Sequence, residues 1–469
     1  MRYSHKVYYQ GRDLFLRKQE KRRNPSAIGS PEFEVFPRLL YSLNENKMYC
    51  SAGLYSRLVN ALKQDKVDIK YTDLRQNKIT SAKFEALLKL QDVEFRHRQL
   101  EVISAIECAE GGVIVCPTGY GKTFIISLLS VIYPTSAIAV ISPGLDLLRS
   151  TYTRLQQYAP NQIGRIGGGH HEYEKRILLC SADSIHKLPM GKIHLLIYDE
   201  VHTAATQQRS EALCSQYTDA KFIGFTASPN VRSDGADAVV ESIFGPVLLQ
   251  ISYAEAADKG IVAKINTKFV EVPRCDQTIE SFGDNTQRKR ISYWCNDNRN
   301  QVIARTCQSV PQLINNPNPQ ILVMVETVEH MFELRRHLPD YEVVYASMDE
   351  GLRRRLRDRG LINEHEAVMD TSRRKWLLDQ FQRGHLRKVI ANHCWKQGID
   401  PIHLNCFVRA DGGTSDINNI QLPGRLSRIT EGKTEGLLID FMDSFDPWAL
   451  RRSQKRLKAY RKANFAIIR

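Results

Sequence analysis

Short apolar runs alternate with amphipathic stretches along two long parts of the chain. Each run is bounded by turn-forming residues, which is typical of strands buried on both faces of a sheet. The runs are Val113–Cys116, Ala137–Ser142, Arg176–Cys180, Leu195–Tyr198, Phe222–Phe225, Ile321–Val325, Glu342–Tyr345, Lys388–Ala391, Cys406–Val408 and Gly436–Phe441. Because helical stretches separate the strands, the pattern predicts βαβ units and parallel sheets. We therefore expect an α/β protein with two tandem lobes, at 86–270 and 301–445, and a connector at 271–300.

The segments outside the two lobes have a different pattern. Apolar residues at 39–43 and 48–51 flank a polar turn and predict a hairpin, 53–63 predicts an amphipathic helix, and 67–74 predicts a further strand. Residues 1–85 are therefore expected to form a small α+β module of ββαβ order, with many Lys and Arg residues in its first part. Residues 446–469 are expected to form a basic C-terminal helix.

The composition is that of an ordinary globular protein with a basic surplus. Hydrophobic residues make up 42% and charged residues 25% of the 469 positions, and the formal net charge is +14. These values exclude disordered, collagen-like and coiled-coil classes, and the surplus favours a nucleic-acid partner. The longest apolar stretch, Phe124–Tyr133, is about half of the ~20 residues that a membrane span needs. We therefore expect a cytoplasmic location and no membrane partner.

The cysteines and histidines predict no metal centre of their own. The 10 cysteines include no C-x-x-C pair, so we expect reduced thiols and no zinc site. His170 and His171 follow three glycines, and this pattern predicts a loop.

A phosphate-binding loop is predicted directly after the first apolar run. The loop consists of Cys116, Pro117, Thr118, Gly119, Tyr120, Gly121, Lys122 and Thr123. Its place between a strand and a helix suits backbone N–H groups that wrap phosphates at a helix N-terminus. Lys122 would contact the β- and γ-phosphates, and the Thr123 hydroxyl would ligate Mg²⁺. Cys116 departs from the usual pattern, which begins with Gly.

An acidic pair ends the apolar run at 195–198. Asp199 and Glu200 stand at the carboxyl end of a predicted parallel strand, where ligands bind in such sheets. Asp199 could hold Mg²⁺, and Glu200 could polarise the water that attacks ATP. Together with the phosphate loop, the pair predicts an ATP-hydrolysing site.

A third motif lies in the second lobe, at Gln421–Arg428 (QLPGRLSR). On a helix, Arg425 and Arg428 are three positions apart and share a face. Two such guanidinium groups could stabilise the charge of a γ-phosphate, which is the arginine-finger arrangement. We expect Gln421 to belong to the same catalytic set.

These motifs, with their order along the chain, resemble the superfamily 2 helicases of the DExH type, here with a DEVH box. The resemblance covers about 90–445 and implies two RecA-like lobes that use ATP and Mg²⁺. It implies adenine contact by Gln99, ATP contact by Asp400, and coupling roles for His202, Thr226 and Ser228. It further implies nucleic-acid contacts by Ser142, Pro143, Gly144, Ser181 and Gly398.

Several motif variants point to one branch of this superfamily. The segments SPGL, TAS and QLPGRLSR differ from those of DEAD-box RNA helicases and resemble branched-DNA helicases of the phage UvsW type, with kinship to RecG-like and XPB-like motors. This implies fork regression, branch migration and 3′–5′ unwinding by a monomer, in replication, recombination or repair. The location would be the host-cell cytoplasm for a phage protein.

Other interpretations remain open at this stage. An RNA helicase or remodeller, or a duplex-translocating motor subunit that does not separate strands, could share the same core. The N-terminal module could grip duplex DNA at a junction or could only stabilise the first lobe. The arginine run at 353–359 could be a phosphate-binding patch or a solvated helix face.

Overall fold

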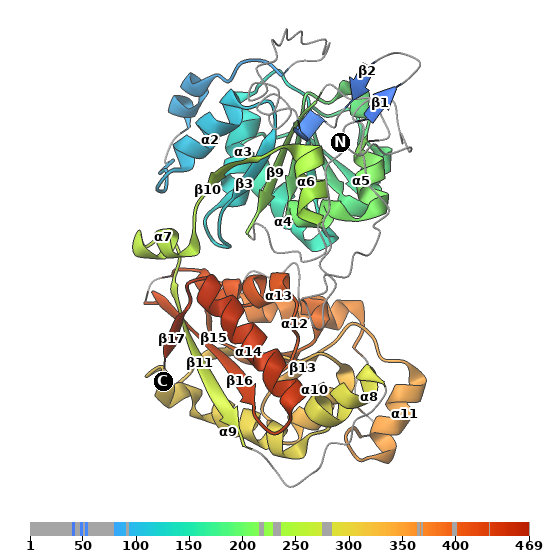
Figure 1. Ribbon diagram of the computed structural model, residues 1–469, viewed down its shortest axis with the longest axis vertical. Coiled ribbons are helices and arrows are strands. Elements are labelled where there is room, and N and C mark those ends of the chain that lie inside the picture. The colour runs from blue at the N-terminus through green and yellow to red at the C-terminus, as the bar shows by residue number, and fades with distance from the viewer. Residues whose placement is uncertain are drawn as a thin grey trace. The chain divides into compact units, whose positions relative to one another are not determined.

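The computed structural model describes residues 40–42, 47–49, 52–54, 79–90, 93–214, 220–227, 236–273, 284–363, 366, 369–395, 401–430 and 432–468. The chain divides into two compact units, Met1–Ser252 and Tyr253–Arg469. Each unit is a parallel sheet with helices packed on it, and Figure 1 labels the elements. The expected α/β architecture of two RecA-like lobes is confirmed.

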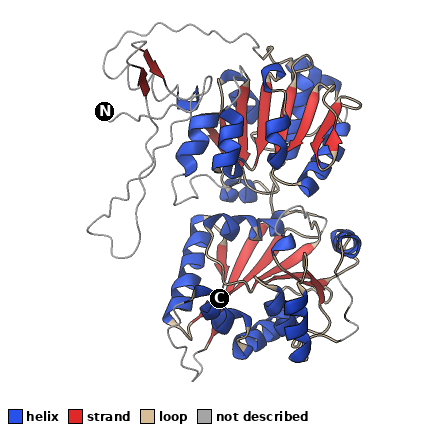
Figure 2. Ribbon diagram, turned by 90° about the vertical axis from the view of Figure 1, so that its right-hand side faces the viewer, coloured by secondary structure: helices blue, strands red, loops and turns tan. Residues whose placement is uncertain are grey.

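The sheet of unit 1 has eight strands, and all of its pairings are parallel except that between β5 and β6. In spatial order the strands are β10 (Val247–Gln250), β3 (Gly112–Val115), β9 (Lys221–Thr226), β8 (Leu195–Asp199), β4 (Ile138–Ser142), β7 (Ile177–Ser181), β5 (Ile163–Gly167) and β6 (His170–His171). The five central strands are buried along their whole length because helices cover both faces of the sheet (Figure 2). The histidine pair, expected in a loop, forms the short strand β6.

Helices and 3-10 turns connect these strands. They are η1 (Ala52–Leu54), η2 (Phe84–Lys89), α2 (Gln99–Cys108), α3 (Lys122–Ile132), α4 (Leu145–Gln156), η3 (Ala182–Lys187), η4 (Met190–Lys192), η5 (Val201–Ala205), α5 (Gln207–Cys214) and α6 (Ala236–Phe244). Helix α3 is the most deeply placed of those near the predicted loop, because seven of its side chains, from Ile125 to Ile132, are buried. That burial anchors the helix whose N-terminus follows the phosphate loop.

The sheet of unit 2 has seven strands, and all of its pairings are parallel. In spatial order the strands are β13 (Glu342–Val344), β14 (Lys388–Ala391), β12 (Gln320–Met324), β15 (Leu404–Arg409), β16 (Glu435–Asp443), β11 (Lys264–Val272) and β17 (Ala466–Ile468). The helical segments are α7 (Tyr253–Asp258), α8 (Asn285–Lys289), the π-helical η6 (Arg290–Trp294), α9 (Asp297–Leu313), α10 (Val328–Arg335), α11 (Glu350–Asp358), α12 (Thr371–Gln382), η7 (His393–Trp395), α13 (Asp416–Gln421), η8 (Pro423–Ser427) and α14 (Pro447–Lys462).

Two expected boundaries differ from those of the structure. Strand β11 was expected within the first lobe, but it pairs along its whole length with β16 in the second sheet. The division therefore falls between Ser252 and Tyr253 and not at residue 270. The C-terminal segment was expected to lie outside the second lobe, yet α14 crosses that lobe (Figure 1) and β17 pairs with β11. Both elements belong to the second lobe.

A network of buried charges fixes α14 to its sheet. The Arg456 guanidinium donates to both carboxylate oxygens of Asp440 and to the Phe441 carbonyl oxygen, and it lies 3.5 Å from Asp443. Arg456, Asp440 and Asp443 are fully buried, and so is Arg299, whose Nε donates to Asp443 at 2.8 Å. Burial alone would lower the pKa of Arg456, but the two aspartates hold it raised. The predicted basic tail is thus part of the core.

The N-terminal segment is described only in part. The predicted hairpin is present as β1 (Leu40–Ser42) and β2 (Lys47–Tyr49), which pair antiparallel. Turn η1 packs against α6 so closely that a Cβ on Gly53 would lie 2.2 Å from the Glu241 carbonyl oxygen, and Leu54 is buried. The remainder of the predicted helix at 53–63 and the strand at 67–74 lie outside the described residues.

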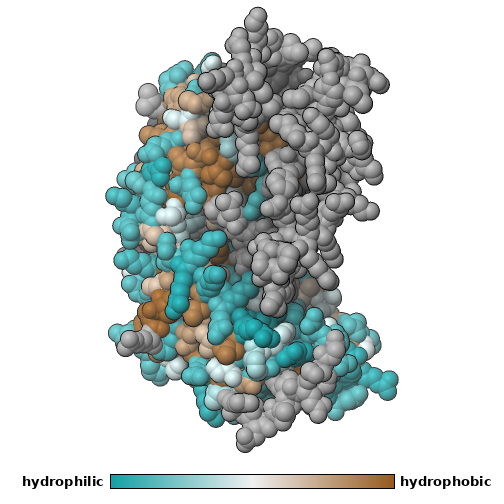
Figure 3. Space-filling view, viewed as in Figure 1, coloured by the Kyte–Doolittle hydropathy of each residue, from teal (hydrophilic) through white to brown (hydrophobic). Residues whose placement is uncertain are grey.

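Among the coloured residues of Figure 3 hydrophilic side chains prevail, and apolar side chains gather in an area of unit 1 and in smaller areas of unit 2. Among the described residues, no helix is both long enough and apolar enough to cross a membrane.

Candidate functional site

The predicted site residues of unit 1 converge at the carboxyl edge of its sheet. Strand β3 leads into the phosphate loop, β9 ends at Thr226, β8 ends at Asp199, and β4 and β7 end at Ser142 and Ser181. These strands are consecutive neighbours in the order β3-β9-β8-β4-β7. Strand β9, which ends at the predicted coupling residue Thr226, therefore lies between β3, which leads into the phosphate loop, and β8, which ends at Asp199. Thr226 is in register with Val115 of β3.

The phosphate loop has the backbone geometry that its glycines predict. Gly119 and Gly121 have φ angles of 89° and 110°, which lie in the left-handed region that favours glycine. A Cβ on Gly121 would approach the Gln99 amide nitrogen to 2.9 Å. Cys116 does not need the glycine that usually opens this loop, because it is buried without a positive φ and its N–H donates to the Thr226 carbonyl oxygen at 3.0 Å.

Lys122 and Glu200 form an ion pair where the loop meets the acidic strand. The Lys122 Nζ donates to Glu200 Oε1 at 2.8 Å, although the two residues are 78 positions apart. The two side chains retain only 11% and 19% exposure. Burial would lower the pKa of Lys122, but Glu200 and Asp199 raise it above its usual value. Burial would raise the pKa of Glu200, but Lys122 and His202 hold it below its usual value. Both groups are therefore charged at neutral pH.

Glu200 is held in an unusual backbone conformation. Its φ of 53° is left-handed, which is uncommon for a residue other than glycine and is often found at functional sites. Its N–H donates to Asp199 Oδ1 at 3.0 Å, and its carboxylate accepts from the Ala227 backbone. The His202 Nδ1 lies 3.5 Å from Glu200 Oε2. The acidic residue thus contacts the strand end that carries the predicted coupling motif.

The segment that precedes α2 contacts the phosphate loop directly. The Gln99 side chain is buried, and its amide nitrogen donates to the Tyr120 carbonyl oxygen at 3.3 Å. Arg96 donates to the carbonyl oxygens of Gly119 at 2.8 Å and Tyr120 at 3.3 Å. The Tyr120 hydroxyl donates to the His97 carbonyl oxygen. Besides its predicted adenine contact, Gln99 therefore positions the loop, and Arg96, from the same predicted adenine-reading segment, shares that task.

The donor set at this edge fits a phosphate-bound Mg²⁺. Thr123 is the second residue of α3. Asp199 supplies a buried carboxylate opposite the phosphate loop. Burial raises the pKa of Asp199 to about 6, while Lys122 opposes this shift. The described residues contain no group of three His, Cys, Asp or Glu side chains that could hold a metal ion alone. Mg²⁺ usually takes one or two protein ligands and completes its shell with phosphates and water, so Thr123 and Asp199 suffice.

The predicted nucleic-acid residues of unit 1 lie together farther along the same edge. Ser142 and Ser181 are directly opposed on the neighbouring strands β4 and β7. Pro143 and Gly144 are half-buried and follow Ser142 at the start of α4. A Cβ on Gly167 would lie 2.3 Å from Ser181 Oγ, so the end of β5 also approaches this edge.

The arginine motif of unit 2 differs from the expected helix. Gln421 ends α13, Pro423 opens the short turn η8, and the turn ends at Ser427, so Arg428 lies in extended backbone beyond it. Pro423 lacks an N–H donor and cannot continue an α-helix from α13. The prediction that Arg425 and Arg428 share a helix face is therefore wrong. Arg425 is buried and donates to the Trp395 carbonyl oxygen at 2.5 Å, whereas Arg428 is half-buried.

Three predicted site residues, Ser228, Gly398 and Asp400, lie outside the described residues.

The chain is similar in sequence to several known proteins. The family model described as the type III restriction enzyme res subunit matches residues 92–231, which hold the phosphate loop and the acidic pair. A protein of Sulfurisphaera tokodaii named "DNA 3'-5' translocase XPB2" is 26% identical over 389 residues, covering 80% of this chain and 86% of its own. A "Probable helicase" of Escherichia phage T5 is 20% identical, covering 90% of this chain and 87% of its own.

Solved structures support the fold. S. cerevisiae Dbp5 bound to RNA and ADP BeF3 has a TM-score of 0.54 at 15% identity and covers 82% of this chain and 92% of its own. A fragment of an HsdR subunit from Vibrio vulnificus has a TM-score of 0.55 at 19% identity, with 88% and 76% covered. The T4 UvsW structure has a TM-score of only 0.36 and does not bear on the branch of the superfamily. With its motifs in order on two RecA-like lobes, and with helicases among its relatives, the chain is a nucleic-acid-dependent ATPase of the helicase type, similar to the superfamily 2 helicases.

Proposed function

We propose that the chain is an ATP-dependent DNA translocase that unwinds or remodels branched DNA. The observation that carries the ATP-dependent part is the Lys122–Glu200 pair at the sheet edge. A lysine and a carboxylate that pair beside a phosphate loop would each bind a different group during ATP hydrolysis. The lysine would exchange Glu200 for phosphate oxygens, and Glu200 would then be free to orient water.

The remaining roles in hydrolysis follow from the same edge. Gly119, Gly121 and the N-terminus of α3 would present N–H groups to the phosphates. Thr123 and Asp199 would hold Mg²⁺, which neutralises charge on the transferred phosphoryl group. Thr226 would couple the nucleotide state of this site to the neighbouring strands, because β9 pairs with both β3 and β8. Arg425 and Arg428 would stabilise the γ-phosphate, and Gln421 would assist them.

DNA is the proposed track, with 3′–5′ polarity. The proposal draws on the net charge of +14, on the motif variants that differ from those of RNA helicases, and on the relative named a DNA 3'-5' translocase. Ser142, Pro143, Gly144, Ser181 and Gly398 would contact the backbone of one strand. Branched substrates are proposed because the basic N-terminal segment, residues 1–85, could hold duplex beside the tracked strand.

A substrate panel tests the proposal. The full chain is assayed for ATP hydrolysis and strand separation on forks, four-way junctions, plain duplex and RNA duplex. We expect forks and junctions to be processed at least several-fold faster than plain duplex, and RNA duplex to be left intact. Faster processing of RNA would favour an RNA helicase. ATP hydrolysis on duplex without strand separation would instead favour a duplex-translocating motor subunit.

A charge variant tests the role of the N-terminal segment. Replacing Lys21, Arg22 and Arg23 by Gln should lower fork processing, while ATP hydrolysis on single-stranded DNA stays near that of the wild type. Equal loss of both activities would mean that the segment only stabilises unit 1, in line with the packing of η1 against α6.

A further inference from the structure

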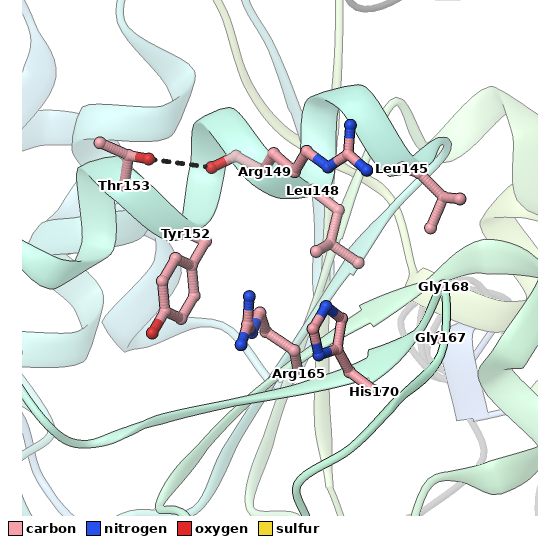
Figure 4. Close-up of a pocket in the computed structure, with 9 residues that line it drawn as sticks. All are labelled: Leu145, Leu148, Arg149, Tyr152, Thr153, Arg165, Gly167, Gly168 and His170. Carbon is pink, nitrogen blue, oxygen red and sulfur yellow. Dashed lines mark hydrogen bonds between the residues drawn. The ribbon is translucent and has the colours of Figure 1, made fainter. Parts of the chain in front are cut away.

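A cavity of about 180 Å³ lies in unit 1, beside the edge that carries Ser142 and Ser181 and apart from the phosphate loop. One wall is the face of α4, and the other is the end of β5 with the loop that leads into β6 (Figure 4). Leu145 continues directly from Gly144, and Gly167 packs on Ser181 Oγ. A strand held by the two serines would therefore pass next to this cavity. The lining residues are Leu145, Leu148, Arg149, Tyr152, Thr153, Arg165, Gly167, Gly168 and His170.

The walls of the cavity offer flat surfaces to a ligand. The Arg165 guanidinium lies 4.7 Å from the centroid of the Tyr152 ring. Figure 4 shows Arg165 and His170 side by side below the cavity, Leu148 above it and Tyr152 at one side. Arg165 Nη2 donates to Glu172 at 3.0 Å, but the buried Arg165 Nε has no hydrogen-bond partner among the described residues. Because this atom has almost no accessible surface, a ligand in the cavity would contact the flat face of the guanidinium and not the Nε donor.

The size and the charge of the cavity select the ligand. A volume of about 180 Å³ is below the ~300–1,000 Å³ of typical ligand pockets, which suits one planar ring system but not a whole nucleotide. A base suits the lining better than a phosphate group does, because Leu145, Leu148 and Tyr152 are largely apolar and the Arg165 charge is already paired with Glu172, although Arg149 also lines the cavity. Nucleobases stack on guanidinium, imidazole and phenol groups.

We propose that this cavity, defined by Tyr152, Arg165 and His170, receives one unstacked base of the single strand that crosses Ser142 and Ser181. This inference rests on the proposed function. One face of the base would lie on Arg165 and His170, and Leu148 would cover the other face. The site would add a base-dependent contact to a strand held otherwise by its phosphates.

A cycle of protein and DNA changes tests the proposal. Single-stranded oligonucleotides, with normal bases or with abasic positions throughout, are titrated into the full-length wild type and Arg165→Lys at one fixed salt concentration. Lysine keeps the charge and the Glu172 partner but removes the flat surface. We expect Arg165→Lys to weaken binding of the normal strand by about fivefold or more, the scale of one lost base stack. Binding of the abasic strand should be the same for both proteins.

Arg154→Lys is the matched control. Arg154 lies on α4, the helix that forms one wall of the cavity, and its guanidinium is 5.9 Å from the centroid of Tyr158, outside the cavity. It should leave both affinities unchanged. If Arg165→Lys weakens both strands by the same factor, the effect passes through phosphate contact or local structure, and the base site is refuted. ATP hydrolysis stimulated by the abasic strand would show that the proposed function holds in that case. A wild type that binds no strand would refute both proposals.

A second measurement needs no variant. Oligonucleotides with 4-thiothymidine are photocrosslinked to the wild type, and the attached peptide is identified. We expect attachment within 145–153 or 165–171. Crosslinks confined to other segments would contradict the proposal.

Discussion

The two units bury charge in different ways. In unit 2, Arg456, Asp440 and Asp443 are fully buried, and each is paired within the protein. In unit 1, Lys122 and Glu200 are also paired, but at the edge of the sheet with 11% and 19% exposure. The charged groups of unit 2 pair with one another and fix α14 to its sheet. The pair of unit 1 lies beside left-handed glycines and a helix N-terminus, where phosphate can replace one partner.

This difference separates a structural network from a site. Breaking a buried ion pair leaves an unpaired charge and costs about 3–5 kcal/mol of stability. Breaking a pair at a ligand-binding edge costs less stability, because water reaches the remaining charge, but it removes a group that the reaction uses. The predictions below test this separation.

The largest expected effect is on turnover, from Lys122→Ala. Because the charge on the β- and γ-phosphates is lost, the DNA-stimulated hydrolysis rate should fall by about 10³-fold. The melting temperature should change by no more than a few degrees. Steady-state phosphate release and thermal unfolding measure the two quantities. A large fall in melting temperature would make Lys122 part of a structural network, like Arg456.

Arg425→Ala and Arg428→Ala should each lower turnover by a similar order, about 10³-fold, if both act as arginine fingers. ATP affinity should fall much less, because unit 1 supplies most of the contacts. The buried Arg425 also holds the Trp395 carbonyl oxygen, so Arg425→Lys serves as its control for packing. Unchanged turnover in both alanine variants would assign the pair to the structure of unit 2.

Arg456→Leu should lower stability and leave turnover unchanged, which is the opposite of the effect expected for Lys122→Ala. It leaves Asp440 buried without its arginine, while Asp443 keeps Arg299, so the free energy of unfolding of unit 2 should fall by about 3–5 kcal/mol. At low temperature, where the protein is still folded, turnover should stay near that of the wild type. Chemical denaturation and the hydrolysis assay check both statements. Loss of turnover in a folded variant would mean that α14 acts on the site.

The smallest effect concerns pH. Burial, followed by the charge of Arg299, lowers the pKa of His330 to about 3, and this ring lies 3.2 Å from Asn300 Oδ1. As the pH falls below ~6.5, the His330 ring takes up a proton in the unfolded chain but stays neutral in the native protein. The free energy of unfolding of unit 2 therefore falls by up to about 1.4 kcal/mol per pH unit until the pH approaches the native pKa. His330→Gln should flatten this dependence in denaturation curves between pH 7 and 5. An unchanged slope would contradict the buried neutral ring.

Local patterns predicted the strands and the phosphate loop because each is encoded by neighbouring residues. All ten predicted apolar runs are strands within one or two residues, and the Lys122–Asp199 edge follows from the parallel order. Long-range pairings were missed: β11 pairs with β16 across 171 positions, from Lys264 to Glu435. Arg456 was expected in a basic helix outside the second lobe, because nothing in the sequence marks Asp440 and Asp443 of the preceding strand β16 as its partners. Pro423 was the available signal against a continuous helix at Arg425, and it was overlooked.

The measurement that tests the account most directly is ATP hydrolysis by the full chain, with and without single-stranded DNA, for the wild type and Glu200→Gln. The account predicts that DNA stimulates ATP hydrolysis by the wild type. In Glu200→Gln the hydrolysis rate should be lower by about 10²-fold or more, and the variant should still bind ATP. An ATPase rate that does not respond to DNA, or a Glu200→Gln variant with wild-type turnover, would contradict it.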